Sequence, residues 1–118
     1  AQLIKAGQQM EVVRSGTKLG HVYNLLAYSQ GPRKDFEPFL ITMLRGDSEA
    51  HPRFRHPGTE FIYVLEGRLE YRHGDQVYLL EPGDAFTFTG EVEHGPERML
   101  DDVIRFIDII VYTQEDQL

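Results

Sequence analysis

Short segments of alternating apolar and polar residues run along the whole chain, and turn-forming residues separate them. The turn signals are Gly31-Pro32, Glu66-Gly67, His73-Gly74-Asp75, Glu81-Pro82-Gly83-Asp84 and Gly95-Pro96. The segments that we predict as strands are Met10–Arg14, His21–Ser29, Pro38–Leu44, Glu60–Leu65, Leu69–Tyr71, Gln76–Leu80, Ala85–Thr89 and Val103–Tyr112. Short strands at this regular spacing are typical of an antiparallel sandwich or barrel, so the predicted fold class is all-β.

The last strand segment, Val103–Tyr112, is apolar at most positions on both of its faces. This pattern predicts a strand that is buried between two sheets or at a subunit contact. Asp108 interrupts the segment, and a buried carboxylate needs a partner. We interpret Asp108 as a strand-end or edge carboxylate that meets water or an arginine, in preference to a catalytic group.

Length and composition limit the domain count and the class of partner. The 118 residues predict one domain over residues 1–118, with a barrel core at about 37–112. A formal net charge of −7 argues against direct nucleic-acid contact by this chain, because phosphate contacts need a basic face. The absence of cysteine excludes disulfides and thiolate metal sites and fits a reducing cytoplasm. No apolar segment has the length of a membrane span, so we expect no membrane partner.

The segment from Phe54 to Gly67 contains the main candidate chemistry. In an extended chain side chains alternate between faces, so His56 and Glu60 can point to the same side. His94 follows two further hairpin signals. Two imidazoles and one carboxylate are able to hold a divalent transition metal, or to form the polar floor of a ligand pocket. Spacing and chemistry leave these two alternatives equally weighted.

Aromatic residues are expected to surround this site. Phe54 has the same parity as His56 and Glu60, so it either fills the core or forms a wall of the pocket. Phe86 and Tyr71 are two further candidate ligand contacts, and for Phe86 the alternative is a place in the core, which is the more common role of a phenylalanine on such a strand. The opposite parity of Phe61, Tyr63 and Leu65 places them toward a second layer or a partner subunit.

The spacing of these residues resembles the two motifs of the cupin family. His56 fits the second histidine of the first motif, Glu60 follows after three residues, and Gly67 follows after six more. Glu81-Pro82-Gly83-Asp84 resembles the second motif, and His94 lies at the expected distance beyond it. The resemblance implies a double-stranded β-helix, or jelly roll, that is usually a dimer. It also implies a metal site of three histidines and one glutamate.

The sequence departs from that four-ligand pattern at its first histidine, where Phe54 stands. The metal ligands that the resemblance implies here are therefore His56, Glu60 and His94. The metals expected for such a set are iron, manganese, nickel or zinc.

The match covers about residues 46–94, and two residues near its end also differ from the family pattern. Glu93 replaces a proline, and Arg98 replaces an asparagine. His51 lies close to the missing position, but its parity differs from that of Phe54 and Pro52 disturbs the register. We therefore do not expect His51 to replace the missing ligand.

The segments from Gly20 to Ala27 and from Glu37 to Ile41 are similar to the sensor half of bacterial regulators that carry an N-terminal helix-turn-helix. This similarity implies the effector-sensing domain of a transcription regulator, with its DNA-binding part outside this chain. We expect a homodimer that binds a small polar or anionic metabolite, and we assign no catalytic residue. The alternative is a stand-alone metal-dependent dioxygenase or isomerase, and a third hypothesis is a barrel that serves dimerisation alone.

Overall fold

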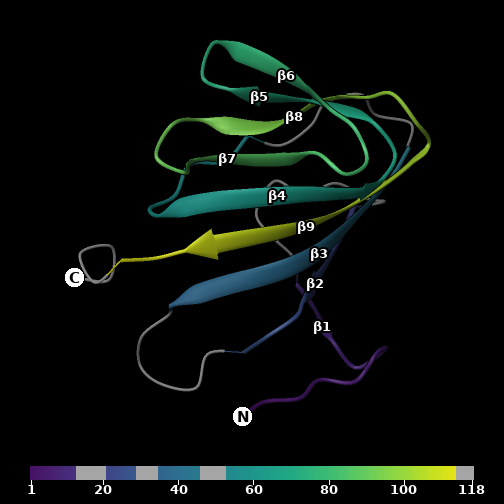
Figure 1. Cartoon of the computed structure of the whole chain (residues 1–118), viewed down its shortest axis with the longest axis vertical. Helices are drawn as coiled ribbons and strands as arrows, with labels where there is room; N and C mark the ends of the chain where they lie inside the picture. The colour runs from purple at the N-terminus through teal and green to yellow at the C-terminus, as the bar shows by residue number, and fades with distance from the viewer. Residues whose placement is uncertain (13–20, 29–34, 46–52, 114–118) are drawn as a thin grey trace.

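The computed structural model of the chain describes residues 1–12, 21–28, 35–45 and 53–113. These residues form strands, turns and loops, in agreement with the predicted all-β class (Figure 1). The strands are β1 (Met10–Val12), β2 (His21–Leu25), β3 (Phe36–Leu44), β4 (Thr59–Glu66), β5 (Leu69–His73), β6 (Gln76–Leu80), β7 (Ala85–Thr89), β8 (His94–Met99) and β9 (Val103–Val111). Within the described ranges no helix is long and apolar enough to cross a membrane.

The strands form two antiparallel sheets that agree with the predicted jelly roll. The larger sheet has the order β1-β2-β3-β9-β4-β7, and the smaller has the order β6-β5-β8. Figure 1 shows β5, β6 and β8 at one end of the molecule and β1 with the N-terminus at the other. Most neighbours in the larger sheet are distant in sequence, as β9 between β3 and β4 illustrates. The sheets therefore bring distant parts of the chain to one site.

Alternation along β4 and β9 places their inward residues in the core. Glu60, Ile62 and Val64 are buried on one face of β4, whereas Tyr63 on the other face is 40% exposed. On β9, the apolar residues on the same face as Ile104, namely Phe106 and Ile110, are also buried. The predicted parity is therefore confirmed. The outward residues of β4 lie on the outer face of the larger sheet rather than against a second layer of this chain.

The turn at Gly67 shows why glycine follows β4. Its φ is +78°, a left-handed conformation that other residues adopt only with strain. A Cβ at this position would also lie 2.2 Å from the backbone oxygen of Val103. Glycine therefore allows the chain to pass close to β9 before it enters β5, and the predicted turn is confirmed.

One predicted turn is wrong, because Gly95-Pro96 lies inside strand β8. The sequence of β8 is polar and contains two turn-forming residues, so it carries no alternating apolar pattern. Its pairing with β5 supplies the backbone partners, with a register shift between Glu70 and Tyr71. β8 lies at the edge of the smaller sheet, where a proline without an N–H is tolerated.

Other strand boundaries differ from the predictions by a few residues. β3 begins at Phe36 rather than Pro38, and β9 ends at Val111 rather than Tyr112. The predicted turn at Gly31-Pro32 lies outside the described residues, as does His51. These differences leave the predicted architecture unchanged.

Candidate metal centre and its pocket

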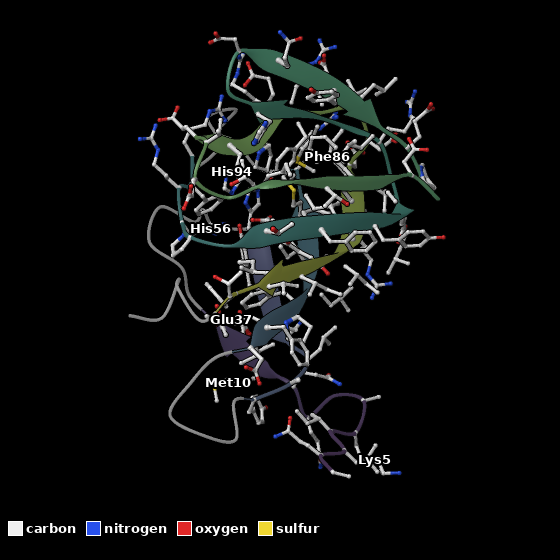
Figure 2. All side chains as sticks on the ribbon, turned by 60° about the vertical axis from the view of Figure 1, so that its left-hand side comes forward. Lys5, Met10, Glu37, His56, Phe86 and His94 are labelled. Atoms are coloured by element: carbon white, nitrogen blue, oxygen red, sulfur yellow. The ribbon has the colours of Figure 1, made fainter. Side chains whose placement is uncertain are left out.

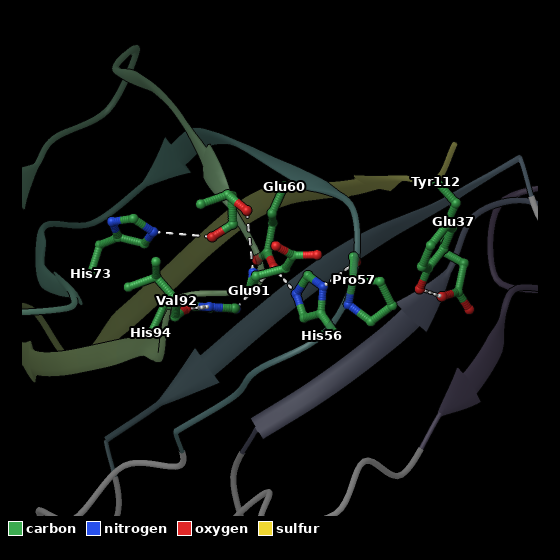
Figure 3. Close-up of polar contacts among 10 residues, drawn as sticks. Glu37, His56, Pro57, Glu60, His73, Glu91, Val92, His94 and Tyr112 are labelled. Carbon is green, nitrogen blue, oxygen red and sulfur yellow. Dashed lines mark hydrogen bonds and ion pairs between the residues drawn. The ribbon is translucent and has the colours of Figure 1, made fainter. Parts of the chain in front are cut away.

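Three side chains predicted to form a site, those of His56, Glu60 and His94, lie close together (Figure 2 for the two histidines, Figure 3 for all three). His56 lies just before strand β4, and Glu60 is the second residue of β4. His94 is the first residue of β8. One nitrogen of each imidazole and one carboxylate oxygen all lie within 4.8 Å of one another. The side chains of His56, Glu60 and His94 are 12%, 4% and 1% exposed. The fold therefore creates a compact, buried group of metal-binding side chains.

Backbone carbonyls fix the orientation of both imidazoles (Figure 3). His56 Nδ1 lies 2.8 Å from the carbonyl oxygen of Pro57, and His94 Nδ1 lies 2.8 Å from that of Val92. A carbonyl oxygen only accepts hydrogen bonds, so both Nδ1 atoms are the protonated donors. In the neutral rings the Nε2 atoms therefore carry lone pairs.

Both of these Nε2 atoms face the same oxygen of Glu60. The distances to Oε1 are 2.7 Å from His56 Nε2 and 3.2 Å from His94 Nε2. His94 Nε2 is buried and makes no well-aligned hydrogen bond among the described residues. In the neutral state two lone pairs and a carboxylate would converge, and a proton or a metal cation between them would remove the repulsion.

The donor set fits a divalent transition metal. Two imidazole nitrogens and one carboxylate oxygen are ligands that iron, manganese, nickel and zinc accept. A histidine that binds a metal usually donates its other ring N–H to a carbonyl or carboxylate, as His56 and His94 do here. The residues present therefore match such a metal in type and in the orientation of their rings.

The carboxyl group of Glu60 is held in the form that binds cations. Burial alone would raise its pKa, but contacts with His56, His94 and Asp108 outweigh burial and keep the pKa well below its usual range. Glu60 is therefore ionised at neutral pH. An ionised carboxylate is the form that a metal ligand requires.

Gly90 supports the ring of His56, and the sequence analysis did not identify it. A Cβ at Gly90 would lie 2.2 Å from His56 Cε1 and 2.3 Å from His56 Nδ1. The N–H of His56 also donates to the Gly90 carbonyl oxygen at 2.9 Å, and the Gly90 N–H donates to Gly58 at 2.8 Å. Its position just after Thr89 was a local signal for a turn, but contact with His56 depends on the β4–β7 pairing.

A narrow pocket, with free space for about one water molecule, lies beside the three side chains. The aromatic and acidic residues among its lining are Tyr23, Phe54, Glu60, Tyr71, Phe106 and Asp108. Of the predicted ligand contacts, Phe54, Glu60 and Tyr71 thus reach this pocket. Phe86 is not among the described lining residues, and its ring packs 4.8 Å from that of Tyr78 and 5.0 Å from that of Phe88. Ligand contact by all six predicted residues remains a prediction.

Phe54 occupies the position of the first family histidine. Its N–H donates to the His94 carbonyl at 2.7 Å, and it accepts from the His94 N–H at 3.0 Å. The two ring centroids are 6.3 Å apart. This backbone bridge fixes Phe54 beside the site, where its ring forms an apolar wall of the pocket.

Asp108 is not the edge carboxylate that we expected. β9 is an inner strand of the larger sheet, and Asp108 is 4% exposed and lines the pocket. It hydrogen-bonds to Glu60 and thereby helps to lower the pKa of Glu60. The sequence-based interpretation was wrong because a lone acidic residue in an apolar segment does not reveal which side chains a distant strand brings to it.

A second acidic residue, Glu97, lies in an ion-pair network close to the pocket. Arg72 contacts its carboxylate at 3.0 Å and 2.9 Å, and Arg53 contacts it as well. Arg53 also donates to the carbonyl oxygen of Pro96 at 2.8 Å, and Pro96 lines the pocket. Hydrogen bonds from Arg72 and the charges of both arginines lower the pKa of Glu97 to about 2.

The comparison with family models identifies the family. The model described as the cupin domain matches residues 39–110. The chain therefore belongs to the cupin domain family, as its two motifs predicted. A comparison with curated proteins finds no match.

Several solved structures have the same fold. HppE with Fe(II) and an alternative substrate, (S)-1-HPP, is 22% identical over 92% of this chain and 60% of its own, with a TM-score of 0.73. Hydroxypropylphosphonic acid epoxidase from S. wedmorenis is 20% identical over 92% of this chain and 59% of its own, with a TM-score of 0.73. An HTH_3 family transcriptional regulator from Vibrio cholerae is 23% identical over 81% of this chain and 53% of its own, with a TM-score of 0.63. This chain thus spans less than two thirds of each of these proteins.

Proposed function

We propose that this cupin domain senses a small polar metabolite for a bacterial transcription regulator, and that a divalent metal forms part of its binding site. The observation that supports the site is the convergence of His56 Nε2 and His94 Nε2 on one oxygen of Glu60, beside a pocket. The metal would be held by these three side chains. When bound, it supplies a Lewis-acidic centre with positions left open for a ligand.

The residues around the metal ligands have separate tasks in this proposal. The carbonyls of Pro57 and Val92 hold the imidazole rings, and Gly90 leaves room for that of His56. Phe54 excludes water from the side of the site where the family pattern has its first histidine. The pocket is thereby apolar at its wall and polar at its floor, which suits a small ligand with one polar end.

Two observations favour a sensor. The fold resembles that of the HTH_3 family regulator, which is about twice as long as the part that this chain matches. The net charge of −7 also fits a domain that leaves DNA contact to another part of its protein. In this proposal the chain forms a homodimer, and the ligand shifts the dimer between two geometries. The change in geometry alters the DNA affinity of a DNA-binding part outside this chain.

A metal-dependent enzyme is the second candidate function. The observation that favours it is the same group of two imidazoles and one carboxylate, together with a fold like that of HppE, which was crystallised with Fe(II). A site with three protein ligands leaves positions at which a substrate can bind. The sensor and the enzyme therefore share the metal site and differ in the fate of the ligand.

Metal content is the first test of the proposed site. The protein is purified without a chelator or histidine tag, and its iron, manganese, nickel and zinc are measured by elemental analysis and by titration. We expect close to one metal ion per chain in the wild type and none in a variant with both Glu60→Ala and His94→Ala. A wild-type protein that neither contains nor takes up any of these metals would contradict the metal site.

A measurement of DNA binding distinguishes the sensor from the enzyme. The protein encoded by the complete gene is tested for binding to the DNA upstream of that gene, with and without metal. The sensor predicts specific binding whose affinity changes with metal or ligand, and a metal-loaded protein that does not turn over its ligand. The enzyme predicts turnover and no specific DNA binding.

A further inference from the structure

The outer face of the larger sheet is apolar on its three central strands, β3, β9 and β4 (Figure 1). Half of the large apolar side chains that are exposed among the described residues lie on this face. They are Phe36, Leu44, Tyr63, Leu65, Val103 and Val111. A large exposed apolar surface on one face of a protein is typical of an interaction site.

Strand pairing makes the apolar residues of this face neighbours. In the register of β3, β9 and β4, Ile107 lies between Leu40 and Tyr63, and the three side chains share one face. Ile109 lies opposite Phe61 in the same way. The apolar side chains therefore form adjoining rows across the sheet, whereas scattered single positions would need no explanation.

The charges on this face balance, although the formal net charge of the chain is −7. At the outward positions of β3, β9 and β4 the charged residues are Arg105 and Glu66, which oppose each other in the β4–β9 register. Two copies of an acidic chain repel each other, and contact at a neutral apolar face keeps that repulsion small. The charge distribution thus favours a second copy of this chain over a strongly basic or acidic partner.

The size of the face is sufficient for a dimer. The three central strands have eight or nine residues, and their neighbours β2 and β7 have five each. With about 4.8 Å between strands and about 3.3 Å per residue, these five strands span roughly 570 Å² of sheet. Two such faces would bury roughly 1,100 Å², which exceeds the roughly 1,000 Å² that a specific interface needs. Asn24 and Thr87 flank the apolar rows as a polar rim.

We propose that two copies of this chain pack the outer faces of their larger sheets against each other, with Tyr63 and Ile107 at the centre of the contact. Such a contact is isologous, because each copy uses the same face. The inference rests on the proposed function, which includes a homodimer, and it assigns the surface of that dimer.

The proposed contact and the candidate metal centre share two strands. Glu60 lies on the inner face of β4, and Asp108 lies on the inner face of β9. The outer faces of the same strands carry Tyr63 and Ile107. A ligand that displaces either strand would therefore also displace the dimer contact, which is the change that a sensor has to transmit.

Sedimentation velocity of the chain in solution tests the proposal. We expect the wild type to have a mass close to twice the 13.6 kDa of one chain. Tyr63→Lys places a charge at the centre of the contact and should increase the dimer dissociation constant at least about 100-fold. Leu79→Lys is the matched control and should leave this constant unchanged, because Leu79 is an exposed apolar residue on β6 in the smaller sheet.

Two further measurements use the wild type alone, so a poorly folded variant leaves the test intact. In a mixture of methyl-labelled and unlabelled chains, isotope-filtered NMR should show contacts between copies at the methyl groups of Ile107 and Ile109. Added salt should leave the dimer unchanged or make it tighter, because salt screens the repulsion between two acidic chains. A dimer that salt dissociates would indicate an ionic contact and contradict this one.

Three other results would overturn this proposal: a monomer at every concentration, a dimer that Leu79→Lys dissociates and Tyr63→Lys does not, or contacts between copies confined to the smaller sheet. Metal content is measured in the same samples. A metal-loaded monomer would refute the dimer and leave the metal site. A dimer through another surface would refute this inference alone, whereas absence of metal from an intact dimer would refute the metal site alone.

Discussion

Glu60 and Glu97 are both carboxylates whose pKa lies below its usual range, but their surroundings differ. Glu60 is buried, lines a pocket and faces two imidazoles. Glu97 has a side chain that is 29% exposed and faces two guanidinium groups, those of Arg53 and Arg72. A lowered pKa therefore occurs here in two kinds of environment, and it does not by itself identify a functional site.

The partners of each carboxylate determine what it is able to do. Arginine is charged at every ordinary pH and donates only, so Glu97 already has permanent counter-ions. Histidine can present a lone pair, so the imidazoles around Glu60 are able to share the carboxylate with a metal. We therefore assign a structural role to Glu97 and a binding role to Glu60, and four substitutions test this distinction.

Glu60→Gln should have the largest effect, because it removes the charged ligand while its amide still fills the same space. We expect the dissociation constant for Zn²⁺ to increase by at least about 100-fold, measured by competition with a chromogenic chelator. Glu97→Gln, the matched control, should bind Zn²⁺ as the wild type does. Equal losses in the two variants would contradict the distinction between these carboxylates.

Gly90→Ala should have the next largest effect, through the position of His56. The added Cβ would lie 2.2 Å from His56 Cε1, so the ring or the turn must move. We expect a loss of about 10- to 100-fold in Zn²⁺ affinity, like that for a residue that orients a ligand. Thr89→Ala adds no atom at this contact and is the control. Unchanged affinity in Gly90→Ala would show that the orientation of His56 is not important for binding.

Phe54→His should have a smaller effect in the opposite direction, because it adds an imidazole nitrogen as a possible metal ligand beside Glu60 and leaves the surroundings of Glu97 unchanged. Phe54 lines the pocket and bridges to His94 through its backbone, at the position where the family pattern has a histidine. We expect metal affinity to increase roughly tenfold, equivalent to about 1.4 kcal/mol. The absorption spectrum of bound Co²⁺ should change as its coordination number increases. An unchanged spectrum would show that this position does not reach the metal.

The smallest effect is expected for Glu97→Gln on acid stability. Because the pKa of Glu97 is about 2 in the folded protein and its reference value is 4.5, its ion pairs stabilise the fold above about pH 4.5. That contribution is lost as the pH decreases from about 4.5 toward 2. The urea midpoint of the variant should therefore be lower than that of the wild type near neutral pH, and the difference should disappear in acid. A pH-independent difference would exclude Glu97 ionisation as its cause.

The strand architecture could largely be predicted from local patterns. Turn residues such as Gly67 and the alternation along β4 depend on neighbours in sequence, and both were interpreted correctly. β8 was missed because its polar residues, with Gly95 and Pro96, form a strand only through pairing with β5. Propensity is a weak signal where pairing with another strand decides the structure.

Some residues of the candidate site could also be predicted from local patterns, whereas others could not. Motif spacing identified His56, Glu60 and His94, because those residues stand at fixed distances from turns. The roles of Gly90 and Asp108 depend on contacts between strands that are distant in sequence, and no local pattern reveals those contacts.

The sequence by itself thus determined the all-β class, the turns that connect the strands from β4 to β7, the family and the three polar residues of the centre. The tertiary structure decided that both Nε2 atoms face one oxygen of Glu60 and that Asp108 joins a pocket. The physical reason is the range of the interactions. Turn geometry and alternation act between neighbouring residues, whereas ring orientation, burial and the charge of a pocket arise only where distant strands meet.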